Sequence, residues 1–115
     1  MPLLRLETNV ALTEEKRATL LAALSKIVAG TIGKPEQYVM VTVTPVAMLM
    51  SGKPGDAAFV DLRSIGGLNN DVNRILAQKI SQTLTEALGV PRNRLFLNFT
   101  DIAPENWGWN GNTFG

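Results

Sequence analysis

The sequence predicts an α/β (α+β) fold in which two β-α-β repeats form a four-stranded sheet with two helices on one face. Two observations carry this prediction. Two long segments have the apolar spacing of amphipathic helices, and each follows a short apolar run typical of a strand. The stretches "GKPEQYVMVTVT" and "GVPRNRLFLNFT" also place matching Gly, Pro and Thr residues 56 positions apart. The 115 residues, 45% of them apolar, are therefore expected to form one domain, 1–115, with pseudo-repeats at about 2–44 and 58–100.

The first repeat begins with "PLLRLET" at 2–8, an apolar run that indicates a strand. A helix is predicted over 13–33, with Thr13 as its N-cap and Gly33 as the residue that ends it. Its buried stripe is predicted to comprise Leu20, Leu21, Leu24, Ile27, Val28 and Ile32. The run "YVMVTVT" that follows indicates the second strand.

The second repeat has the same order, starting with "AFVDLRS" as a strand. In the helix that follows, Asn69 or Asn70 is the expected cap and Gly89 the expected stop. The predicted buried stripe comprises Val72, Ile75, Leu76, Ile80, Leu84 and Leu88. Two amphipathic helices can look alike by chance, but the coincident Gly and Pro positions favour a true repeat.

The strand "YVMVTVT" is semi-apolar on both faces. Val39, Val41 and Val43 point to one face, and Met40, Thr42 and Thr44 to the other. Such strands are usually covered on both sides, and two helices cover only one. Other copies of the chain are therefore expected to supply the second cover, which predicts a homo-oligomer.

Composition excludes several classes of function. A net charge of +1 without a basic stripe argues against a nucleic-acid partner. Pro45 interrupts the longest apolar segment, which is too short to span a membrane. Without a signal-peptide pattern, we expect a cytoplasmic protein, for which leaderless export stays open. The absence of His and Cys excludes a Ser-His-Asp triad, a thiolate nucleophile and a histidine-ligated metal.

Pro2 directly follows the initiator Met1 and is a candidate general base. The α-amino group, with an ordinary pKa of about 8, is one of the few groups in this chain that titrate near neutral pH. Aminopeptidase removal of Met1 would expose a secondary amine whose ring fixes its direction. The alternative is that Pro2 only begins an edge strand, where its missing N–H has no cost.

The chain resembles the macrophage migration inhibitory factor family of the tautomerase superfamily along its whole length. The resemblance rests on "MPLLRLETNV", "GKPEQYVMV", "LRSIGGLNNDVNR" and "LFLNFTDIAPENWGWNGNTF", together with the doubled β-α-β plan. It implies a homotrimer with sites at the subunit interfaces. It also implies a keto-enol tautomerase for phenylpyruvate-like aromatic α-keto acids, with Pro2 as the base and no cofactor.

The same resemblance implies roles for three further residues. Lys34 would pair with the substrate carboxylate, the backbone N–H of Ile65 would bind the substrate, and Asn98 would reach the site from the neighbouring protomer. Each has a simpler interpretation, respectively a solvated cation at a helix end, a plain Gly-Gly connection and a polar strand residue facing solvent.

The sequence departs from the family pattern at three places. Phe96 stands where mammalian members have a tyrosine, so its ring can stack on a substrate but cannot donate a hydrogen bond. Trp107 replaces a smaller aliphatic residue and would narrow the pocket rim, unless it and Trp109 only pack at a subunit interface. The "AAFV" at 57–60 replaces a CxxC motif, so thiol redox activity is excluded.

Two other functions remain compatible with the sequence. One is a cytokine-like trimer that binds a protein receptor and has only vestigial catalysis. The sequence does not decide against it, because a receptor-binding surface has no sequence motif here. The same proline could also serve another reaction of the superfamily, such as dopachrome tautomerisation.

Overall fold

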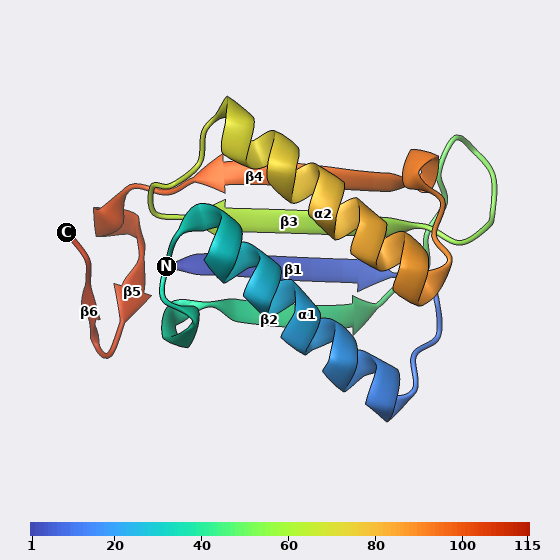
Figure 1. Cartoon of the computed structure of the whole chain (residues 1–115), viewed down its shortest axis with the longest axis horizontal. Coiled ribbons are helices and arrows are strands. Elements are labelled where there is room, and N and C mark those ends of the chain that lie inside the picture. Colours follow the sequence, from blue (N-terminus) through green and yellow to red (C-terminus); the bar gives the residue numbers. More distant parts are fainter.

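A computed structural model describes all residues, 1–115. The main elements are β1 (Pro2–Thr8), α1 (Glu14–Ile32), β2 (Met40–Pro45), β3 (Ala58–Ser64), α2 (Asn70–Leu88) and β4 (Leu95–Asp101). A short hairpin, β5 (Gly108–Trp109) and β6 (Asn112–Thr113), ends the chain (Figure 1). Three single-turn 3-10 helices precede β2, β4 and β5: η1 (Glu36–Tyr38), η2 (Arg92–Arg94) and η3 (Pro104–Asn106).

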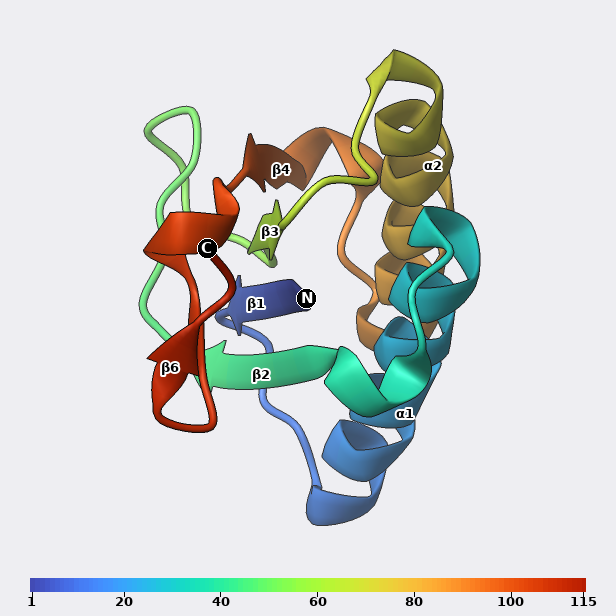
Figure 2. The same cartoon turned by 90° about the vertical axis from the view of Figure 1, so that its left-hand side faces the viewer.

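The four long strands form one mixed sheet in the order β2-β1-β3-β4. β1 runs parallel to β2 and β3 parallel to β4, while the central pair β1 and β3 is antiparallel. Both helices cover the same face of the sheet (Figure 2). The starts of β1 and β3, of α1 and α2, and of η1 and η2 are each 56 residues apart. The predicted fold of two β-α-β repeats is confirmed.

Both helices begin and end at the residue types that the sequence indicated. The Oγ1 of Thr13 accepts a hydrogen bond from the N–H of Lys16 at 3.1 Å, and the Oδ1 of Asn69 accepts one from the N–H of Val72 at 2.9 Å. Asn69, and not Asn70, is therefore the cap of α2. Gly33 and Gly89 end the helices with φ of +80° and +73°, a left-handed conformation that glycine adopts without a steric penalty.

The core lies between the two helices and the sheet face that they cover. Its fully buried members include Leu4, Leu6, Leu24, Val28, Val60, Leu62, Leu76, Ile80 and Leu84. The predicted stripe of α2 is wrong at one position, because Ile75 is 42% exposed. Leu76, Ile80, Leu84 and Leu88 follow the i, i+4 spacing that faces the sheet, and Ile75 lies about 100° away from Leu76 around the helix.

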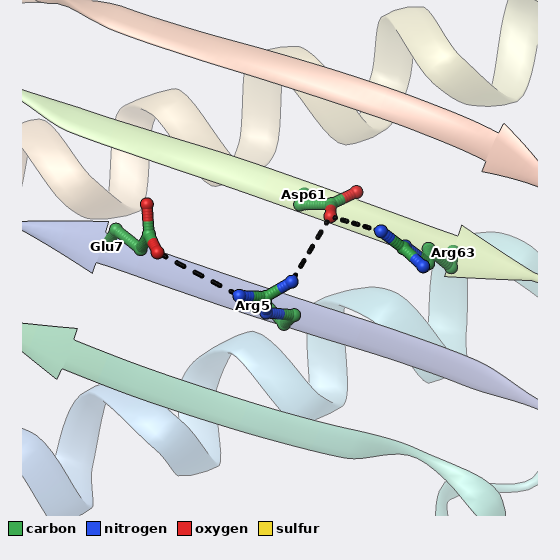
Figure 3. A network of polar contacts seen from close by, with 4 residues as sticks. All are labelled: Arg5, Glu7, Asp61 and Arg63. Carbon is green, nitrogen blue, oxygen red and sulfur yellow. Dashed lines mark hydrogen bonds and ion pairs between the residues drawn. The ribbon is translucent and has the colours of Figure 1, made fainter.

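The opposite face of the sheet is polar along its two central strands. Arg5 of β1 and Arg63 of β3 both contact Oδ2 of Asp61, at 3.7 and 3.2 Å, and Arg5 also lies 3.9 Å from Glu7 (Figure 3). Asp61 is 11% exposed in its side chain, so both arginines shield it from water. The second face of β2 is semi-apolar, as predicted for this strand, since Met40 is 63% exposed there beside two threonines. The same face of β1 and β3 is charged instead.

Arg94 holds the long loop between β2 and β3 at the far end of the sheet. Its guanidinium donates hydrogen bonds to four backbone carbonyls of this loop, those of Met50, Lys53, Gly55 and Asp56, at 2.9 to 3.3 Å. The loop therefore keeps its place beside the start of β4.

Neither α1 nor α2 is apolar enough to cross a membrane.

Candidate active site

Two cavities meet at the N-terminus, at the end of the sheet where the central strand β1 begins. The first, of about 450 Å³, is lined by Pro2 and Trp107 among others. The second, of about 330 Å³, is lined by Lys34 and Ile65. Met1 and Tyr38 line both cavities. Four of the six residues that the sequence pointed to therefore surround the first residue of the chain.

The Met1 amino group lies in an environment that disfavours its protonated form. Partial burial lowers the pKa of this amine below its ordinary value, and the positive charge of Lys34 lowers it further. Pro2, the next residue, is fully buried at the head of β1. The Met1 amine therefore holds its proton less tightly than an ordinary terminal amine.

Lys34 and the turn after β3 are brought together by a close backbone approach. Gly67 has φ of +79°, and a Cβ at this position would lie 2.6 Å from Cγ2 of Ile32 and 3.5 Å from Cε of Lys34. A side chain here would push the end of α1 away from the turn. The glycine thus lets Lys34 and Ile65 line the same cavity.

An aromatic cluster forms one wall of the site. Trp109 packs edge-on against Tyr38, with ring centroids 6.1 Å apart and planes at 87°, and it stacks on Phe114 at 6.2 Å and 12°. Such arrangements are the favoured geometries of aromatic pairs. Sequence reasoning missed Tyr38 and Phe114, although both belong to quoted stretches, "GKPEQYVMV" and the C-terminal "WNGNTF". Their rings gather because the hairpin β5–β6 returns beside the N-terminus (Figure 1).

Phe96 and Asn98 do not reach this site within one chain. Pro2 of β1 pairs with Ser64 of β3, and Ser64 pairs with Asp101 of β4. These three residues form one row across the sheet, and the site lies at the end of the sheet where this row is. Asn98 precedes Asp101 by three residues and lies roughly 10 Å along β4 from this level, with Phe96 farther still. Phe96 is 63% exposed, and both residues lie on the sheet face that the helices leave open.

Neither the other large cavity nor the acidic residues of the surface form an alternative candidate site. A larger hollow of about 610 Å³ lies between the first half of α1 and the last half of α2, but no predicted site residue lines it. No three Asp or Glu residues come close enough to form a metal site, and the chain has no His or Cys.

A protein-family model described as macrophage migration inhibitory factor (MIF) matches residues 1–115. The chain belongs to the MIF family. A MIF homolog of Trichuris trichiura is 37% identical over 115 residues, which cover 99% of this chain and 100% of the relative. The structures of MIF from Toxoplasma gondii and of a MIF homologue from Prochlorococcus marinus both superpose with a TM-score of 0.94. They are 34% and 32% identical in sequence, cover 97% and 98% of this chain, and are each covered to 99%.

The family and the fold support a tautomerase or MIF-like role for this chain. The resemblance that the sequence motifs indicated is therefore confirmed. The cavities around Met1 are where such an activity would be expected, because ligand sites are concave and mostly apolar, with a few convergent polar groups.

Proposed function

We propose that this MIF-family protein is a cofactor-independent keto-enol tautomerase that acts on phenylpyruvate-like aromatic α-keto acids. In this proposal, Pro2 is the general base after Met1 has been removed. The observation that supports it most directly is the meeting of two cavities at Met1, with Pro2 in one, Lys34 and Ile65 in the other, and aromatic side chains along both.

Removal of Met1 would join the two cavities, because Met1 lines both of them. The nitrogen of Pro2 would then lie at their junction as a free secondary amine. It would share the burial and the Lys34 charge that lower the pKa of the present terminal amine. A lowered pKa increases the fraction of the amine that is neutral near pH 7 and able to accept a proton.

The reaction moves one proton and needs no co-reactant. The nitrogen of Pro2 takes a proton from the carbon next to the carbonyl, and the C–H electron pair becomes the new C=C bond. The carbonyl π electrons move to oxygen, which then receives the proton from the Pro2 ammonium. In this scheme Lys34 pairs with the carboxylate, the N–H of Ile65 donates to a substrate oxygen, and Trp107 contacts the substrate ring.

A neighbouring protomer would complete the site. Phe96 and Asn98 lie away from Pro2 on the open face of β4, as expected of residues that serve a different copy of the chain. We therefore expect a homotrimer, with a sedimentation-equilibrium mass of roughly three times the 12.5 kDa of one chain. A stable monomer at micromolar concentration would contradict both the trimer and the shared site.

The proposed activity is tested by following the enol-to-keto conversion of phenylpyruvate with protein whose intact mass shows that Met1 is absent. A chain that retains a residue before Pro2 has its proline nitrogen in a peptide bond, and we expect it to be inactive. Equal rates for the processed and the extended chains would rule out Pro2 as the base.

The substitution Lys34→Ala is expected to raise the KM for phenylpyruvate by about 10- to 100-fold, because a charge-assisted contact is worth about 1.5–3 kcal/mol. The matched control is Lys26→Ala, which removes the same charge from the exposed surface of α1. Steady-state kinetics of both variants decide the point. An unchanged KM in Lys34→Ala would show that the carboxylate binds elsewhere.

A further inference from the structure

Three successive peptide groups in the turn after β3 are held by hydrogen bonds. The carbonyl of Ser64 accepts from the N–H of Ile102 at 2.9 Å, and the N–H of Gly66 donates to Oδ1 of Asp101 at 2.9 Å. The hydroxyl of Ser64 donates to the carbonyl of Gly66 at 2.7 Å. The turn is thus tied to the end of β4, 35 residues further along the chain.

Ile65 lies between the first two of these peptide groups. Its N–H belongs to the plane that contains the Ser64 carbonyl, and its own carbonyl belongs to the plane that contains the Gly66 N–H. Both planes are therefore oriented by the adjacent residues Asp101 and Ile102. The N–H of Ile65 itself donates no hydrogen bond within the chain. Ile65 is half-buried and lines a cavity together with Lys34 and Met1, so its N–H, a donor without a partner, is available to a ligand there.

We infer that Asp101 is a positioning residue that aims the Ile65 N–H at the substrate. This inference rests on the proposed tautomerase function and adds to it a residue that sequence motifs did not single out. Asp101 is the only side chain in this arrangement that holds the turn from another element. Its cross-strand partner is Ser64, so the strand register itself delivers the carboxylate to the Gly66 N–H.

The test compares Asp101→Ala with Asp101→Asn in the Met1-free protein. The amide oxygen of asparagine can still accept the hydrogen bond from Gly66, whereas alanine cannot. For phenylpyruvate we expect kcat/KM to fall on the order of tenfold in Asp101→Ala, through kcat as well as KM, because a small misplacement of a binding group is costly. Asp101→Asn should stay within about threefold of the parent, since a neutral bond replaces a charged one.

The two Asp101 variants distinguish an effect of turn position from an effect of charge, since both remove the same negative charge. A field effect on Lys34 or the amine would change both variants alike, whereas positioning changes only the alanine variant. Asp56→Ala serves as a third control, because it removes an exposed carboxylate that makes no side-chain hydrogen bond at the far end of the sheet. Its kinetics should match those of the parent.

Amide hydrogen exchange provides a readout that does not depend on catalysis. Exchange at Gly66 should accelerate by about tenfold or more in Asp101→Ala and much less in Asp101→Asn. Unchanged exchange at Gly66 in the alanine variant, or equal losses of activity in both variants, would overturn the inference. If the parent itself fails to convert phenylpyruvate, the proposed function is wrong, and the exchange at Gly66 still decides whether Asp101 holds the turn.

Discussion

The substitution Pro2→Gly, with Met1 still removed, is expected to lower kcat/KM for phenylpyruvate by about 10²–10⁴-fold while the oligomer is retained. Glycine keeps a terminal amine, so some activity should remain. That amine is primary and free to rotate, however, so both its basicity and its direction change. The ring of Pro2 is fully buried at the head of β1, so its loss should also lower the free energy of unfolding. A retained oligomer mass separates that effect from the loss of the base.

The pH dependence of the parent provides a second check on Pro2. A general base must be neutral, so the rate should rise with pH and level off above the pKa of the base. Because burial, and secondarily Lys34, lower the pKa of the terminal amine, the midpoint should fall below the ordinary α-amino value. Measurement of kcat/KM from pH 5 to 9 would show this. If Pro2→Gly keeps the parent's rate and profile, another residue is the base.

The substitution Leu62→Ala is expected to lower the free energy of unfolding by about 2–5 kcal/mol. Leu62 is fully buried at the centre of β3, paired across the strands with Leu4 and Phe99, so its truncation leaves a cavity under both helices. Urea unfolding at fixed protein concentration would measure the shift in midpoint.

The matched control for Leu62 is Leu49→Ala, which removes the same atoms from a loop position that is 68% exposed. This control should change the free energy of unfolding by less than about 0.5 kcal/mol. Similar losses in the two variants would contradict the assignment of the core to the layer between the sheet and the helices.

Much of the fold follows from the sequence because the responsible signals are local. The 3.6-residue period of leucines and isoleucines, a Thr or Asn before each helix and a Gly after it involve residues within one or two turns of each other. The repeat of these signals at 56 residues then predicts the pairing of the two units. The position of Pro2 behind Met1 indicated a candidate base, and the family resemblance added Lys34 and Ile65; the structure brings all three around Met1.

The remaining features depend on contacts between distant parts of the chain. The sequence does not indicate, for example, that Asp61 lies between two arginines on adjacent strands. The aromatic cluster at Trp109 likewise needs the C-terminal hairpin to return to the start of β1.

The hydrogen bond between Asp101 and Gly66 shows most clearly why such contacts cannot be predicted from local sequence patterns. It exists because the register of β3 and β4 places Ser64 opposite Asp101, and a slip of one residue would turn that carboxylate to the other face of the sheet. The elements, their ends and their repetition therefore follow from local signals in the chain. The contacts of Asp101 and of the aromatic cluster do not, because strand register and the packing of the helices on the sheet arise from many long-range contacts acting together.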